Sequence, residues 1–270
     1  MKQAIKKAIP DAVWPFVRDG YIGIRDLPQL PAAYLHPWRR ESMQRLAELK
    51  DIHKGRRGFI IGNGPSLKQT DLSKLKGEIT FGLNRIYLMF PELGFQTTYL
   101  SVVNDLVIEQ TAGDLAALEI PKFLCWRARR FFPNSQAANL PTFLYTTYDA
   151  PRFSTDVRGR VWEGATVTYV TMQLAFHMGF DQVVLIGVDN NYATSGKPNT
   201  TVTSEGDDPN HFSGQYFGKG FRWQLPDLET SELAYHMARQ AYERAGRSIV
   251  DATVGGKLTI FPKTDYNSLF

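Results

Sequence analysis

The chain carries little cysteine, no long apolar run and no strong excess of either charge. Cys125 is the single cysteine among 270 residues, which excludes a disulfide framework and a CxxC-type zinc or redox site. No apolar run approaches the roughly 18–20 residues needed to cross a bilayer. The 31 Lys and Arg outnumber the 27 Asp and Glu only slightly, too little to indicate a nucleic-acid partner. We therefore expect a soluble, cytoplasmic protein that binds no nucleic acid.

Residues 1–55 differ from the rest of the chain, because five prolines divide them into short pieces. Apolar residues recur there at roughly helical spacing beside lysines, at Ile5, Ile9, Val13, Trp14 and Val17. Such a stripe is typical of a helix that packs on its own domain, or of one that lies on a membrane surface. We predict an N-terminal helical appendage over residues 1–55 with a helix at 41–49. Peripheral contact with the inner membrane face is the alternative role.

From residue 57 onward, short apolar runs alternate with helical patterns. Strands are predicted at 58–62, 79–83, 98–103, 122–126, 142–145, 183–187 and 248–250, and helices at 107–118, 166–178 and 228–245. This alternation predicts a doubly wound, mostly parallel, Rossmann-like α/β sheet in a single domain, residues 56–270. Residues 190–225 are rich in Gly, Asn, Asp, Thr and Pro without periodicity, which predicts a lid-like loop.

A glycine-rich turn, GNGPSL at residues 62–67, follows the first predicted strand directly. Glycines permit a tight turn and a close ligand, and the exposed amide groups of such a turn favour an anion. The turn lacks the Gly-Lys-Ser/Thr of a Walker A loop and the third glycine of GxGxxG. It predicts a nucleotide-binding site through Gly62, Asn63, Gly64 and Ser66, with a plain strand-to-helix turn as the alternative.

Polar residues also follow three other predicted strands. Asn84 and Arg85 come after the second strand, where the amide suits a base or sugar edge and the guanidinium suits phosphate. Asn104 follows the third. Asp189 follows strand 183–187, where a carboxylate suits a ligand hydroxyl or a divalent metal, or braces the next loop. Because an Asp-x-Asp pair is incomplete there, we predict no metal site.

His211 is the candidate general base. It alone among the five histidines lies in a loop among glycines, carboxylates and aromatics, and imidazole titrates near neutral pH. A packed, structural histidine is the alternative. Basic side chains of the same loop would balance charge on a leaving phosphate. The candidate contacts to phosphate or to an acceptor are Thr166, Tyr192, Lys219 and Arg222.

Four motifs together resemble two related protein families. They are IIGNGPSLKQTDLSKL (60–75), GLNR (82–85), GATVTYVTMQLAFHMGF (164–180) and VVLIGVDNNY (183–192). They are similar to the bacterial sialyltransferases of glycosyltransferase family 42 and to the MptE-like family, once called domain of unknown function 115. The second family includes archaeal 6-hydroxymethylpterin diphosphokinases. The resemblance covers residues 57–250 and leaves the first 55 residues outside.

The resemblance to the sialyltransferases implies transfer from a CMP-sugar without a metal. It implies donor contacts from Asn63, Ser66, Asn84 and Asn104, and a general base at His211. A different alignment of the loop places Gln215 at the base position. Arg85 stands where the family has a glutamine that reads the nucleotide.

The resemblance to the diphosphokinases implies ATP and Mg²⁺ instead, with Asp189 near the metal. We favour a glycosyltransferase that moves a sugar, such as a CMP-activated acidic sugar, to a glycan or other hydroxyl acceptor, with His211 and Asp189 as catalytic candidates. The alternatives are an ATP-dependent pyrophosphokinase acting on a pterin-like alcohol, and a non-catalytic nucleotide- or glycan-binding module. The sequence leaves a homo-oligomer open.

Overall fold

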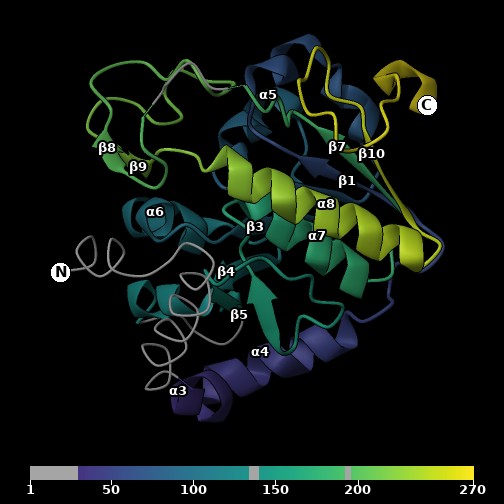
Figure 1. Ribbon diagram of the computed structural model, residues 1–270. Helices are drawn as coiled ribbons and strands as arrows, with labels where there is room; N and C mark the ends of the chain where they lie inside the picture. The colour runs from purple at the N-terminus through teal and green to yellow at the C-terminus, as the bar shows by residue number, and fades with distance from the viewer. Residues whose placement is uncertain (1–29, 134–139, 192–195) are drawn as a thin grey trace, which may run out of the picture.

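The centre of the protein is an eight-stranded sheet in which every neighbouring pair of strands is parallel (Figure 1). The computed structural model describes residues 30–133, 140–191 and 196–270. The strand order is β10-β7-β1-β2-β3-β4-β5-β6. The strands are β1 (Arg57–Ile61), β2 (Thr80–Leu83), β3 (Tyr99–Val102), β4 (Lys122–Cys125), β5 (Thr142–Thr147), β6 (Arg160–Trp162), β7 (Gln182–Ile186) and β10 (Ser248–Asp251). The predicted doubly wound α/β fold is confirmed.

Helices flank this sheet. The α-helices are α3 (Leu30–Leu35), α4 (Pro37–Glu48), α5 (Phe90–Leu93), α6 (Asp105–Ala117), α7 (Val167–His177) and α8 (Leu228–Arg244). The short 3₁₀ helices are η2 (Pro65–Gln69), η3 (Leu72–Leu75), η4 (Ile86–Met89), η5 (Trp126–Phe131) and η7 (Tyr266–Leu269). Helix α7 packs across β1, β2, β3 and β6, and α8 packs on α7 (Figure 1).

Local sequence explains the central elements. In β7 the last four residues are buried, as expected for a parallel strand covered on both faces. Helix α7 begins where Thr166 caps it by accepting a hydrogen bond from the Thr168 amide. Helix α8 buries one stripe at helical spacing, including Ala234, Ala238 and Tyr242. The apolar runs and periodic stripes of the sequence therefore become the layers of the fold.

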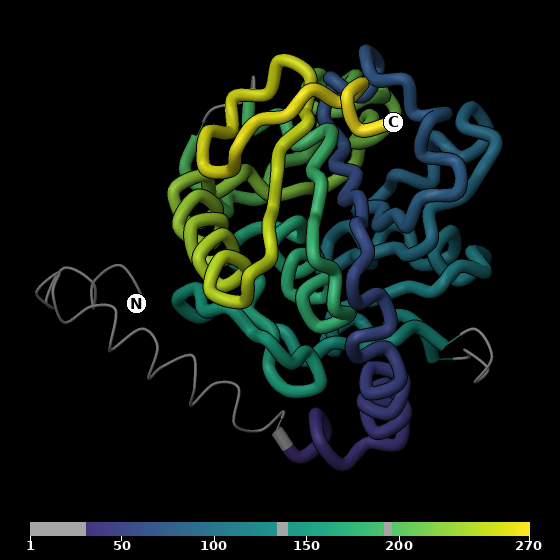
Figure 2. Tube along the Cα trace, turned by 90° about the vertical axis from the view of Figure 1, so that its right-hand side faces the viewer, coloured from purple at the N-terminus to yellow at the C-terminus, as the bar shows by residue number. Residues whose placement is uncertain are grey.

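The chain reverses direction across the sheet between β1 and β7. It runs from β1 outward to β6 and then returns to place β7 on the other side of β1. Figure 2 shows β10, β7 and β1 side by side, with the C-terminus near them. In open α/β sheets, ligands bind at the carboxyl ends of the strands at such a switch point.

Residues 30–55 pack on the end of the sheet. Arg39 is buried and donates to the Arg158 carbonyl at 2.5 Å, and Ser42 Oγ accepts from the Phe143 amide at 2.9 Å. Helix α4 begins four residues earlier than expected, because the His36 side chain caps its first turn. The apolar stripe at residues 5–17 lies outside the described residues. None of the described helices is long and apolar enough to cross a membrane.

The structure contains short strands that the sequence did not predict. Strand β6 was not predicted, and residues 190–225 contain an antiparallel hairpin of β8 (Thr201–Thr203) and β9 (Arg222–Gln224). Each of these strands has three residues, too few for an alternating pattern to stand out from the surrounding polar sequence. Their pairing partners, rather than their own patterns, define them.

Candidate functional site

A polar cavity of about 110 Å³ opens at the carboxyl ends of β1, β2 and β7. It therefore lies at the switch point of the sheet. Residues from the start of α7, from α8 and from the loop before β9 complete its walls. Seven of the predicted site residues line it: Gly62, Asn63, Gly64, Asn84, Thr166, Asp189 and His211.

The glycine-rich turn fits closely against the chain that leaves β7. A Cβ atom on Gly62 would lie 2.2 Å from the Gly187 carbonyl oxygen, and one on Gly64 would lie 1.8 Å from Asp189 Oδ2. The amides of Gly62 and Gly64 donate to the carbonyls of Ile186 and Gly187 at 2.8 and 2.9 Å. These donors are therefore used inside the protein. The expectation that they face an anion does not hold for these two glycines.

Asp189 braces this turn. Its Oδ1 accepts from the Ser66 amide at 3.1 Å, and its Oδ2 accepts from Ser66 Oγ at 2.7 Å. The sequence left bracing of a loop open as the alternative role of Asp189. Ser66, a predicted nucleotide contact, is not among the residues that line the cavity. The described residues contain no group of three or more His, Cys, Asp or Glu placed to hold a metal ion.

Two asparagine side chains give the cavity unmatched acceptors. The Oδ1 atoms of Asn63 and Asn84 are buried and accept no hydrogen bond from any described group. The Asn84 amide nitrogen is engaged with the hydroxyl of Tyr216. Because buried polar atoms are normally paired, these two oxygens are suited to a ligand donor such as a base amino group or a ribose hydroxyl.

Backbone strain is concentrated around the cavity. Asn84 and Asn190, which line it, have φ values of 47° and 50°. Ala165, one residue before the wall residue Thr166, has φ 60°. Left-handed conformations at non-glycine residues cost on the order of 1–3 kcal/mol each and occur preferentially at functional sites. Three of the residues at or beside this cavity therefore have left-handed backbone conformations.

The positive end of a helix dipole faces the cavity. Thr166, Val167 and Thr168, at the start of the 11-residue α7, line it. The buried hydroxyl of Tyr235 on α8 hydrogen-bonds to both threonine side chains, and burial raises the pKa of this hydroxyl. A helix N-terminus favours an anion such as phosphate. This surface, rather than the glycine-rich turn, is the better phosphate site.

No Lys or Arg is among the described residues that line the cavity. One basic side chain reaches its rim: Lys257 Nζ donates to Asn191 Oδ1 at 3.1 Å. The sequence analysis did not single out Lys257, because no motif surrounds it. The start of α7 is therefore the main source of partial positive charge among the described residues of the wall.

His211 stands in the wall with its ring fixed on two sides. Its Nδ1 lies 2.6 Å from Asp208 Oδ2, and its ring stacks on Tyr216 with centroids 4.0 Å apart. The neighbouring Phe212 amide donates to the Asn63 carbonyl at 2.8 Å, which joins this loop to the glycine-rich turn. Asp208 and Tyr216 were missed in the sequence. The sequence could have indicated this pair, because Asp208 precedes His211 by three residues, a spacing at which side chains meet in a turn.

The structure places Arg85 and Lys219 away from this cavity. Both line a separate hollow outside the loop, together with Gln215, the other candidate for the base position. Arg85 donates to the carbonyls of Gln215 and Tyr216, and its guanidinium lies 5.1 Å from the Phe221 ring centroid. Arg85 therefore holds the loop rather than a phosphate.

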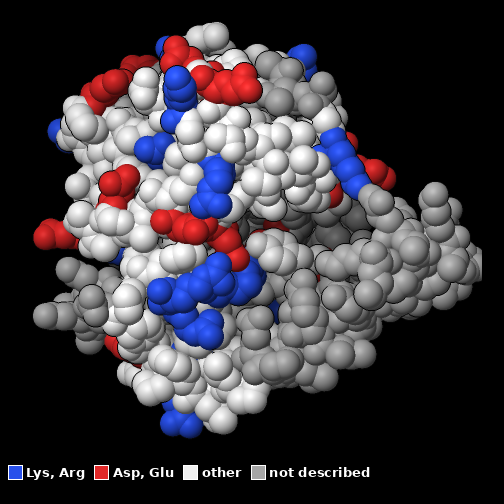
Figure 3. All heavy atoms as spheres, turned by 90° about the vertical axis from the view of Figure 1, so that its left-hand side faces the viewer, with Lys and Arg blue, Asp and Glu red and all other residues white. Residues whose placement is uncertain are grey.

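Asn104 and Arg222 also serve the scaffold. Asn104 caps α6 by accepting from the Leu106 amide at 2.9 Å, and its amide nitrogen donates to Gln224 of β9 at 3.2 Å. Arg222 pairs with Glu109 of α6 at 3.0 Å. Figure 3 shows basic and acidic side chains side by side on this face of the molecule. Tyr192 lies outside the described residues.

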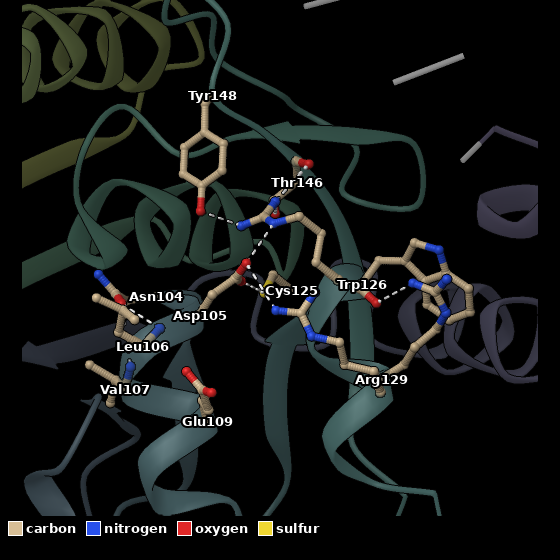
Figure 4. A network of polar contacts seen from close by, with 12 residues as sticks. Asn104, Asp105, Leu106, Val107, Glu109, Cys125, Trp126, Arg129, Thr146 and Tyr148 are labelled. Atoms are coloured by element: carbon tan, nitrogen blue, oxygen red, sulfur yellow. Dashed lines mark hydrogen bonds and ion pairs between the residues drawn. The ribbon is translucent and has the colours of Figure 1, made fainter. Parts of the chain in front are cut away.

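A second polar cluster, absent from the sequence analysis, lies on the same edge of the sheet. Figure 4 shows Asp105, at the start of α6, near Thr146 of β5 and Tyr148, which directly follows β5. Arg127 joins them, donating to Thr146 Oγ1 at 2.9 Å, Tyr148 Oη at 2.6 Å and Glu163 Oε1 at 2.7 Å. Burial raises the pKa of Glu163, against the opposing effect of Arg127. Because Glu163 begins the turn that leads into α7, the cluster anchors that turn.

Cys125 belongs to this cluster and is not an activated nucleophile. Its thiol donates to Asp105 Oδ1 at 3.2 Å and is fully buried. Burial raises the pKa of the thiol, whereas reactive cysteines have a lowered pKa and some exposure.

The fold is similar to that of a solved glycosyltransferase structure. No family model matches the chain, and no curated protein sequence matches it. The structure of the MAf glycosyltransferase from Magnetospirillum magneticum AMB-1 matches with a TM-score of 0.47 and 15% identity. The match covers 91% of this chain and 41% of that one, so the chain spans less than half of that protein's length.

Proposed function

We propose that this protein is a glycosyltransferase that uses a nucleoside-monophosphate sugar, of the CMP-sugar kind, and a hydroxyl acceptor. The observation that carries the proposal is His211 held by Asp208 in the wall of an amide-lined cavity at the switch point of the sheet. A histidine oriented by a carboxylate is a common general base.

The cavity chemistry supports a nucleoside with one phosphate. Asn63 and Asn84 offer acceptor oxygens to a base or ribose, and the start of α7 offers one anion site. A diphosphate would need more positive charge than one helix end and the rim residue Lys257 supply. One phosphate group, as in a CMP-sugar, needs only the single anion site at the start of α7.

The transfer itself needs one proton acceptor. As the acceptor hydroxyl oxygen attacks the anomeric carbon, its proton passes to His211. The bond between that carbon and the phosphate oxygen breaks, and the nucleoside monophosphate leaves with the electron pair. The positive end of α7 stabilises the negative charge that develops on the phosphate.

The size of the cavity implies that part of its wall moves. About 110 Å³ is smaller than the roughly 300–1,000 Å³ typical of ligand pockets. The loop that carries His211 is joined to the sheet through the Phe212 amide and through Arg85. We therefore propose that this loop opens to admit the donor and closes over it, which would also limit hydrolysis.

The diphosphokinase reading is disfavoured by the state of Asp189. It is the one carboxylate among the described residues that line the cavity, and Ser66 already occupies both of its oxygens. A Mg²⁺ ion there would have to share this carboxylate with the Ser66 hydrogen bonds. The non-catalytic reading is disfavoured by the fixed His211–Asp208 pair, which simple binding does not require.

A ligand screen tests these readings. CMP, CDP, UDP, GDP and ATP are titrated with and without Mg²⁺ while the melting temperature is followed. We expect CMP to stabilise the protein without Mg²⁺, and CMP-N-acetylneuraminate to be hydrolysed slowly. Stabilisation by ATP with Mg²⁺ alone would instead support the diphosphokinase. Unchanged donor hydrolysis by His211→Ala would contradict the assignment of the base.

A further inference from the structure

We infer that Asp208 is a positioning residue that sets the tautomer of His211, so that Nδ1 carries the proton and Nε2 is the atom that accepts one. The inference rests on the proposed function. Asp208 is 9% exposed, and its Oδ2 lies 2.6 Å from His211 Nδ1. No motif in the sequence assigns Asp208 a role.

Backbone donors hold the Asp208 carboxylate as an acceptor. Its Oδ1 accepts from the Asn210 amide at 2.9 Å, and its Oδ2 accepts from the Phe217 amide at 3.1 Å. Its own amide donates to the Gly214 carbonyl at 3.0 Å. An ionised carboxylate only accepts hydrogen bonds, and two backbone amides already donate to this one. The group facing it, His211 Nδ1, must therefore be the donor.

Aromatic packing fixes the plane of the histidine ring. Tyr216 stacks on it with an interplanar angle of 14°, and Phe217 meets it edge-on at a centroid distance of 4.9 Å. Tyr216 is itself held, because its hydroxyl accepts from the Arg85 amide at 3.4 Å. With Nδ1 engaged and the ring plane fixed, Nε2 remains for the acceptor hydroxyl.

The proton balance is simple. The acceptor's proton moves to Nε2, and Nδ1 keeps its own proton, so an imidazolium forms beside the Asp208 carboxylate. Asp208 takes no proton; it stabilises the charge and keeps the ring in place. The alternative is that Asp208 serves only to hold the turn of residues 208–217. In that case His211 could carry its proton on either nitrogen.

The first test is spectroscopic and needs no substrate. In the full-length protein labelled with ¹⁵N-histidine, long-range ¹H–¹⁵N correlation spectra distinguish the two neutral tautomers. His211→Gln identifies which signals belong to this residue. We expect the Nδ1–H tautomer in wild type, with and without CMP. A neutral His211 that carries its proton on Nε2 would overturn the inference.

The second test separates positioning from folding. We expect Asp208→Asn to lower kcat for hydrolysis of CMP-N-acetylneuraminate by roughly 10²–10⁴-fold, as when a histidine partner loses its carboxylate. KM and the CMP dissociation constant should stay within about threefold. Asp207→Asn is the matched control, because Asp207 is the exposed neighbouring carboxylate. Its kcat should remain that of wild type.

The outcomes distinguish the two proposals. If Asp208→Asn keeps the wild-type kcat while His211→Ala loses activity, the role of Asp208 is wrong and the proposed function stands. If His211→Ala keeps full activity, the proposed base is wrong. If Asp208→Asn does not fold, the inference is tested by the spectroscopic measurement of the His211 tautomer in the wild-type protein alone.

Discussion

At the residue scale, the decisive feature is a pair of buried amide oxygens without partners. Asn63 Oδ1 and Asn84 Oδ1 are buried and accept no hydrogen bond from the described residues. An unsatisfied buried acceptor costs about 1–3 kcal/mol. Two such acceptors in one cavity are suited to a ligand that brings hydrogen-bond donors.

Asn63→Ala should weaken CMP binding without destabilising the free protein. Loss of one hydrogen bond, worth about 1 kcal/mol, corresponds to binding roughly five- to tenfold weaker. Because the Oδ1 atom is unpaired, its removal should leave the melting temperature equal or slightly higher. Calorimetry and thermal melts check both. Asn267→Ala, at an exposed site, is the control. A large fall in melting temperature with unchanged CMP affinity would show that Asn63 is structural.

At the element scale, residues 206–221 behave as a small unit with its own aromatic core. Phe217 stacks on Phe221 with centroids 4.8 Å apart and on Trp223 at 5.6 Å. This core shapes the loop, and Arg85 at the end of β2 connects it to the sheet. The position of His211 in the cavity therefore depends on a contact outside the cavity.

Arg85→Met should loosen this loop while the sheet stays folded. Charge-assisted bonds to two carbonyls are lost, at a local cost of roughly 2 kcal/mol. We expect faster amide hydrogen exchange in residues 208–217 and a KM for donor about tenfold higher. Arg222→Met is the matched control, because its exposed pair with Glu109 should contribute little. Equal exchange in the two variants would rule out the connecting role of Arg85.

At the scale of the whole molecule, two arrangements shape the two ends of the sheet. The reversal of strand order between β1 and β7 creates the crevice. Residues 30–55 then close the opposite end of the fold, where His53 Nε2 and the Tyr99 hydroxyl lie 2.8 Å apart. Burial, and secondarily the charge of Arg56, lower the pKa of His53 below its ordinary 6.5.

His53 should make the fold less stable in mild acid. Because the pKa of His53 is lowered in the folded state, the unfolded state binds more protons below pH 6.5, and the fold loses stability as the pH falls below that value. Urea unfolding at several pH values should show a weaker pH dependence for His53→Gln than for wild type. His236→Gln, on the exposed side of α8, should keep the wild-type dependence. An identical dependence in all three proteins would contradict this role.

The sequence alone determined the layers of the fold and the general place of the site. Buried parallel strands and amphipathic helices leave periodic patterns, so β1, β7 and α8 were predictable within a few residues. The GNGPSL turn and His211 stood out because glycines directly after a buried strand and a histidine in a polar loop are residue types suited to a ligand site. Strands of three residues carried no such pattern.

Only the tertiary structure decided what each site residue does. Arg85 and Asn63 both follow strands and look alike in the sequence, yet one holds a loop and the other faces the cavity. Asp189 became a brace because Ser66, far away in the chain, supplies both of its donors. Asp208 gained its role from a turn that returns it to His211. The periodicity of a sequence indicates which residues are buried. The orientation, hydrogen bonds and charge environment of a side chain depend on partners that only the folded chain brings near it.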